Sequence, residues 1–120
     1  MNTSIKRFDP AAEFLIPEGC HITELSNSND DPDVSIAQAR VESGVMTELH
    51  WLENVWERYV ILAGQGEVEV GSEPFSPVGP GDVVLIPPGC HQRIRNSGSS
   101  DLVFLAICSP RFTPDCYHSH

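Results

Sequence analysis

The side chains best suited to chemistry in this sequence are an imidazole and a carboxylate, His50 and Glu57. Side chains alternate between the two faces of a strand, so His50 shares a face with Leu52, and Glu57 shares a face with Tyr59. If a hairpin turns both faces inward, the imidazole and the carboxylate converge inside a small protein. Burying two such groups in an apolar interior is costly unless they pair with each other or bind a metal ion.

A third candidate comes from the neighbouring residues His91 and Gln92. Adjacent strand residues point to opposite faces, so only one of the two side chains can look inward. Histidine is the more usual metal ligand, whereas glutamine offers a neutral carbonyl oxygen. With Gln92 inward, one nitrogen and two oxygens would leave positions open for water or a substrate.

Short strands separated by glycine and proline turns must position these residues. Alternating, branched and aromatic residues predict seven strands: 34–41, 47–52, 58–63, 67–70, 83–86, 92–95 and 102–108. Turn sequences such as Gly64-Gln65-Gly66 and Pro87-Pro88-Gly89 separate them. No window supports a long helix, although residues 9–16 could form one short turn. The pattern predicts an all-β fold, an antiparallel sandwich or barrel.

Length and charge exclude several classes of protein. The chain has 120 residues, enough for one domain with a proper core. Its net charge of −10 repels phosphate backbones and anionic lipids, so we expect neither nucleic acid nor a membrane as partner. No apolar stretch follows Lys6 and Arg7, which predicts a cytoplasmic protein without a signal peptide. The four cysteines are therefore expected to be reduced thiols.

We predict a single domain over residues 1–120, with an N-terminal strap and loop (1–33), the barrel (34–110) and a C-terminal tail (111–120). The tail contains Cys116, His118 and His120, a composition that resembles a metal-binding cluster. Because it is terminal, we expect it to be flexible. Cys90 is the one thiol that stands beside the candidate site.

From residue 44 onward the sequence resembles the cupin family, the small double-stranded β-helix barrels. The first cupin motif is Gly, five residues, His-x-His, three or four residues, Glu, six residues and Gly. Here it begins at Gly44, passes through His50 and Glu57, and ends at Gly64. The spacing is kept, but Leu52 stands where the family has its second histidine.

The second cupin motif is Gly, five residues, Pro-x-Gly, two residues, His, three residues and Asn. Here it runs from Gly81 to Asn96 with every spacing kept. Counting from either end selects Gln92, and not His91, as the residue at the histidine position. The resemblance thus implies a cupin barrel whose third inward position carries an amide.

The resemblance also implies a divalent metal at His50, Glu57 and Gln92, with Mn, Fe, Ni or Zn compatible with the mixed nitrogen and oxygen ligands. The alternative is an empty pocket or an internal hydrogen-bond network, because cupins that have lost ligands can hold no metal. A homodimer of paired barrels is a further implication.

Two functions follow as hypotheses. The first is an enzyme acting on a small organic molecule, of the isomerase, cyclase, lyase or dioxygenase type, with the metal as Lewis acid. Glu57 and Tyr59 would be catalytic, and Arg40, Leu52 and Tyr59 would line the substrate pocket. Alternatively, Tyr59 fills the core and Arg40 lies on a solvated strand face. The second hypothesis is a metal-free barrel that binds or senses a small-molecule ligand without turnover.

Overall fold

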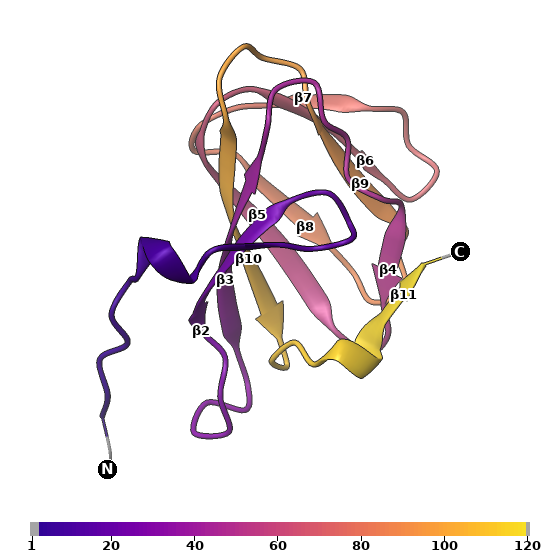
Figure 1. Cartoon of the computed structure of the whole chain (residues 1–120). Coiled ribbons are helices and arrows are strands. Elements are labelled where there is room, and N and C mark those ends of the chain that lie inside the picture. The colour runs from indigo at the N-terminus through magenta and orange to yellow at the C-terminus, as the bar shows by residue number, and fades with distance from the viewer. Residues whose placement is uncertain (1–2, 120) are drawn as a thin grey trace.

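The computed structural model describes residues 3–119, which form two antiparallel sheets packed into a barrel (Figure 1). The six-stranded sheet contains, in spatial order, β1 (Phe14–Leu15), β2 (His21–Ser26), β3 (Ser35–Val41), β10 (Leu102–Ser109), β5 (Trp56–Ala63) and β8 (Val83–Ile86). The five-stranded sheet contains β11 (Tyr117–Ser119), β4 (His50–Leu52), β9 (Gln92–Asn96), β6 (Gly66–Val70) and β7 (Ser76–Val78). Two short 3-10 helices, η1 (Pro10–Ala12) and η2 (Pro114–Cys116), complete the described chain. The predicted all-β fold, a double-stranded β-helix, is confirmed.

All seven predicted strands are present, and the structure adds β1, β2, β7 and β11. β7 escaped the sequence pattern because it contains Pro77, which has no N–H to donate to a sheet. Pro77 is tolerated because β7 lies at the edge of its sheet, where one side of the strand has no neighbour. β1 and β2 bring the N-terminal strap into the six-stranded sheet.

The C-terminal tail is not the flexible segment that its position suggested. β11 pairs with β4, with Tyr117 opposite Leu52 and Ser119 opposite His50. Figure 1 shows this strand, in yellow, beside β4. Backbone hydrogen bonds to β4 hold the tail in place. The tail in turn covers β4, which would otherwise be an exposed edge of its sheet. His120 lies outside the described residues.

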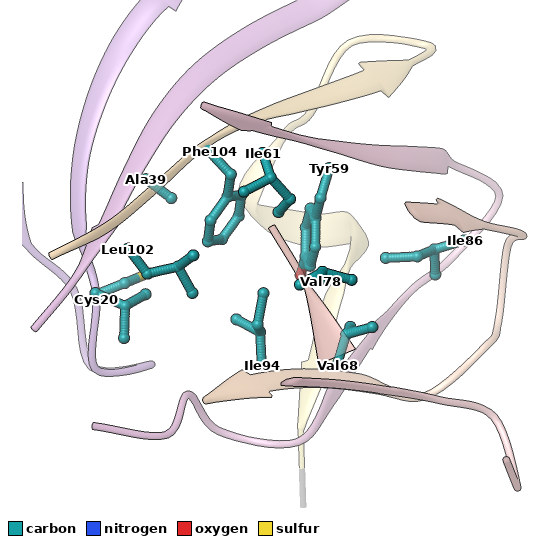
Figure 2. Packing of buried hydrophobic residues seen from close by; sticks show 11 residues of the cluster. Cys20, Ala39, Tyr59, Ile61, Val68, Val78, Ile86, Ile94, Leu102 and Phe104 are labelled. Carbon is teal, nitrogen blue, oxygen red and sulfur yellow. The ribbon is translucent and has the colours of Figure 1, made fainter. Parts of the chain in front are cut away.

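Apolar side chains from both sheets fill the barrel interior (Figure 2). Ile61 and Phe104 of the six-stranded sheet point toward Ile94 and Val68 of the five-stranded sheet. A smaller cluster contains Leu52, Val55, Cys108 and Cys116. The larger cluster thus includes residues of β5 and β9, and the smaller one includes Leu52 of β4, so all three strands that carry the candidate site are anchored in apolar packing.

Gly64 of the first motif has a structural role at the turn between β5 and β6. Its φ is +86°, and a Cβ atom there would lie 2.4 Å from the carbonyl oxygen of Asp101. Only glycine allows the turn to pass so close to the backbone that enters β10. This motif glycine shapes the barrel and does not contribute to its chemistry.

Exposed apolar residues gather near the β8 edge of the six-stranded sheet: Trp56, Leu62, Val83 and Leu85. Nothing in the structure shows what covers them, so the homodimer stays a prediction. Within residues 3–119, the chain has no helix of the length and apolarity that a membrane crossing requires.

Candidate functional site

His50 occupies the inner face of β4, directly opposite Gln92 of β9. Its Nδ1 atom lies 2.8 Å from the carbonyl oxygen of Glu48 and 3.5 Å from Oε1 of Glu18. Because a carbonyl oxygen only accepts, the Nδ1 atom carries a proton and donates it to this contact. The imidazole also stacks on Tyr117, with ring centroids 4.9 Å apart.

Glu57 lies on β5 and is only 8% exposed. Burial raises the pKa of its carboxyl to about 7, an effect that the nearby His50 opposes and the negative charge of Glu18 reinforces. Its Oε2 atom contacts the Cys108 thiol at 3.8 Å. Its Oε1 atom is buried and has no hydrogen-bond partner among residues 3–119. Buried polar atoms without a partner are rare, and the Gln92 amide is close enough to hydrogen-bond to this carboxyl and lower its pKa.

Gln92 is fully buried, as the alternation rule and the motif spacing predicted. The Tyr59 hydroxyl donates a hydrogen bond to its Oε1 atom. Its Nε2 atom has no hydrogen-bond partner within the described chain, although the amide lies near enough to Glu57 to oppose part of the rise in the pKa of that carboxyl. Burial, together with the charge of Glu57, raises the pKa of Tyr59, which therefore stays a phenol.

A cavity of about 650 Å³ lies against these residues, within the size range of small-molecule sites. His50, Leu52, Glu57 and Tyr59 line it, as the sequence predicted for Leu52 and Tyr59. Other parts of the wall are apolar and come from β2, β3, β10 and the C-terminal segment: Ile22, Ala37, Ala39, Phe104, Ala106, Phe112 and Pro114. Gln92 is not part of the wall but lies behind Tyr59, to which it is hydrogen-bonded.

Arg40, expected in the pocket, lies outside it. Ala39 faces the cavity, so its neighbour Arg40 points to the outer side of β3. There the guanidinium forms ion pairs with Glu13 at 2.7 Å and Asp101 at 3.3 Å. The structure therefore places Arg40 where the alternative interpretation did, on the outer face of the strand.

The fold and the cavity can now be compared with known proteins. The Cupin domain family matches residues 38–108 of this chain, more than half of its length. The chain belongs to the cupin family. A curated relative, the uncharacterized protein MJ1618 of Methanocaldococcus jannaschii, is 32% identical over 108 residues and covers 88% of this chain and 86% of its own.

Solved cupin structures with the same fold include enzymes. A predicted oxalate decarboxylase from Thermotoga maritima is 28% identical, with a TM-score of 0.69, over 76% of this chain and 80% of its own. Pac13, a Streptomyces nucleoside dehydratase, is 17% identical with a TM-score of 0.76, over 96% of this chain and 90% of its own. The second likeness shows the fold alone.

Cupins commonly bind divalent metals, but the residues of this cupin do not fit one well. Leu52 fills the position of the second histidine and packs in the smaller apolar cluster. Gln92 directs its oxygen to Tyr59, and its free end is an NH₂ group, which is not a metal ligand. Across residues 3–119, no three His, Cys, Asp or Glu side chains come together as a metal site. His50 and Glu57 are left without a third protein ligand.

Sequence reasoning missed two residues of the site, Glu18 and Tyr117. Glu18 lies between β1 and β2, and its Oε2 atom accepts a hydrogen bond from the Cys20 thiol at 3.3 Å. Tyr117 reaches the site because β11 pairs with β4. Both lie far from the two cupin motifs in the chain, so no local signal could have placed them beside His50.

Proposed function

We propose that this cupin is an enzyme that performs general acid–base chemistry on a small organic molecule inside its cavity, without a metal ion. The observation that carries the proposal is the Glu57 carboxyl, which is buried in the wall of the cavity that His50 also lines and has a pKa of about 7. A group whose pKa lies near the working pH is the most effective proton donor or acceptor.

His50 and Glu57 would divide the proton transfers. The Nε2 lone pair of His50 takes a proton from a carbon next to a carbonyl group. The carboxylate of Glu18, 3.5 Å from Nδ1, stabilises the imidazolium that forms. Protonated Glu57 gives its proton to the carbonyl oxygen, or to a hydroxyl group that leaves as water. In the first case an enediol forms, His50 delivers its proton to the neighbouring carbon, and Glu57 takes back a proton from the enediol hydroxyl, which gives an isomerase. In the second case the C–H and C–O bonds break, an alkene and water leave, and the proton on His50 passes through solvent to restore Glu57, which gives a lyase.

The relatives support chemistry of this kind but do not decide the reaction. Pac13 is described as a nucleoside dehydratase, which shows that a barrel of this fold hosts a dehydration. In this cupin, Tyr59 would hold Gln92 and close the wall behind Glu57, and would not transfer a proton, because its pKa is raised. Tyr59 is thus a positioning residue in the proposal.

Exchange of carbon-bound protons in D₂O tests the proposal without knowledge of the natural substrate. Hydroxyacetone, aminoacetone and pyruvate serve as neutral, cationic and anionic probes, and proton NMR follows deuterium incorporation. We expect exchange with at least one probe, reduced about 10²-fold or more in His50→Asn and in Glu57→Gln. His91→Asn, the same change on the opposite face of the chain next to Gln92, is the matched control. Exchange that is absent, or unaffected by the first two variants, overturns the proposal.

Metal analysis tests the proposal that the enzyme works without a metal ion. Protein purified without a tag is incubated in turn with Mn(II), Fe(II), Ni(II) and Zn(II), desalted, and compared with His50→Ala. We expect well below about one ion per chain and no difference between the two proteins, because the protein offers too few ligands. About one ion per chain that is lost in His50→Ala would establish the metal-dependent enzyme instead.

A binding barrel without turnover is the second candidate, favoured by the largely apolar wall of the cavity. In that case Glu57 and His50 would recognise a ligand and no solvent deuterium would enter any probe.

A further inference from the structure

Four carboxyl groups line the cavity, those of Glu18, Glu24, Glu48 and Glu57, and within residues 3–119 no lysine or arginine lines it. We infer that the cavity selects a small molecule that carries a protonated amine beside an apolar or aromatic portion, and that it rejects organic acids. The inference rests on the cavity of the proposed function and names the class of ligand that this cavity takes.

The cavity carboxyl groups lack the partners that acidic residues have elsewhere in this protein. Glu18 is hydrogen-bonded by a thiol and lies 3.5 Å from an imidazole, and Glu48 accepts a hydrogen bond from the Tyr117 hydroxyl at 3.2 Å. In the part of the chain that the structure describes, none of the four forms an ion pair with lysine or arginine. The negative charge of Glu18, Glu24 and Glu48 is therefore available to a ligand.

The carboxyl groups extend from the mouth of the cavity to its wall. Glu24 and Glu48 are exposed, the Glu18 side chain is 13% exposed and Glu57 is 8% exposed. A cleft lined by charges of one sign concentrates ions of the opposite sign along its length. A cation would meet acidic groups from the mouth to the wall, whereas a carboxylate would meet them without a lysine or arginine to pair with.

The cavity offers both contacts that an ammonium group needs. Glu57 lines it, and within residues 3–119 its carboxyl forms no ion pair with lysine or arginine. The rings of Tyr59, Phe104 and Tyr117 line the same cavity. Aromatic faces attract cations and also pack against apolar parts of a ligand. Carboxyl groups beside aromatic rings recognise an amine and offer no favourable charge to an acid.

The test compares three probes of similar size that differ in charge: 2-phenylethylamine, 2-phenylethanol and phenylacetate. Isothermal titration calorimetry at neutral pH and low salt measures their affinities for the full chain. We expect the amine to bind about tenfold more tightly than the alcohol, since one close charge pair in a partly buried site is worth at least that factor. Phenylacetate should show no detectable binding.

Two single-charge variants separate cavity charge from overall charge. Glu48→Gln removes a carboxylate from the cavity mouth, and Glu67→Gln removes one that is paired with Arg95 on the outer surface. We expect Glu48→Gln to weaken amine binding severalfold and Glu67→Gln to leave it unchanged, with thermal melts confirming that both variants fold. Tighter binding of phenylacetate, equal binding of all three probes, or binding of none at millimolar concentration overturns the inference.

Failure of this inference is distinguishable from failure of the proposed function. A preference for the amine without exchange that depends on His50 and Glu57 would keep the ligand class and overturn the enzyme. Exchange confined to pyruvate would keep the enzyme and overturn the ligand class.

Discussion

Polar side chains on the outer face of β9 are paired, whereas those on its inner face differ in how completely they are hydrogen-bonded. On the outer face, Arg93 pairs with Glu69 at 2.8 Å and Arg95 pairs with Glu67 at 2.9 Å, each across the strand pair with β6. Both guanidinium groups also lie over the ring of Phe75, at 5.4 and 4.1 Å from its centroid.

On the inner face, only one of the polar residues is fully satisfied. Asn96 donates to the carbonyl oxygens of Val41 and Ser100 and accepts from the amide of Gly98. Gln92 lies four residues earlier on the same face of β9. Its Nε2 atom has no hydrogen bond of normal geometry to any group in residues 3–119, and the same is true of the Oε1 atom of Glu57. The polar groups on the outer face of β9 are thus paired, whereas Gln92, behind the cavity wall, is only partly hydrogen-bonded.

Among the tests of this comparison, the largest loss of stability is expected at Ile94, the apolar residue between Gln92 and Asn96. It is completely buried, and Ile94→Ala should lower the free energy of unfolding by about 4 kcal/mol, through lost burial and a cavity that the barrel cannot close. Urea denaturation at pH 7 measures the change. A loss as small as that of the outward variant Arg93→Ala would show that the two faces do not differ in packing.

The second largest effect is expected from Glu57, which makes the free energy of unfolding depend on pH. The pKa of its carboxyl is raised from 4.5 to about 7 in the fold, so the folded state retains a proton that the unfolded state loses. The contribution is fully present below pH 4.5 and is lost as the pH rises through about 7, a difference of about 3 kcal/mol. Denaturation of wild type and Glu57→Gln from pH 4 to pH 8 should show this decline in the wild type alone. His50, Glu18 and Cys108 are the titratable groups that act on this carboxyl, and parallel declines in both proteins would assign the effect to groups other than Glu57.

Asn96 should have an intermediate effect. Asn96→Ala removes its three hydrogen bonds and leaves the carbonyl oxygen of Val41 without the buried amide group that it accepts from. We expect a loss of about 2 kcal/mol in the free energy of unfolding, with no change in ligand affinity, because Asn96 does not line the cavity. Altered affinity for 2-phenylethylamine would contradict the structural role assigned to this motif residue.

The smallest effect should come from the ion pairs of the outer face. Arg95→Ala removes an exposed pair and one cation–π contact, for a loss below about 1 kcal/mol that shrinks further in 1 M salt. Comparing wild type and variant in urea at two salt concentrations checks both parts. A salt-independent loss above about 2 kcal/mol would place Arg95 among the residues that build the barrel.

Much of the site could be predicted because it depends on local spacing. Alternation along short strands placed His50 with Leu52 and Glu57 with Tyr59 on shared faces, and the spacing of the second cupin motif selected Gln92 as the inward residue. The glycine and proline turns marked where strands end, so all seven predicted strands are found. These features follow from a few neighbouring residues and the fixed geometry of a strand.

Only the tertiary structure decided which partners these side chains meet. Tyr59 engages the oxygen of Gln92 that a metal would have needed, and β11 brings Tyr117 against His50. Arg40 turns outward to Glu13, a residue 27 positions earlier, which leaves the carboxyl groups of the cavity wall without an arginine. Such contacts join segments far apart in the chain, and no periodicity in the sequence encodes the distance between them. The sequence by itself determined which faces are inward, and packing alone determined that the inward face is acidic and open to a ligand.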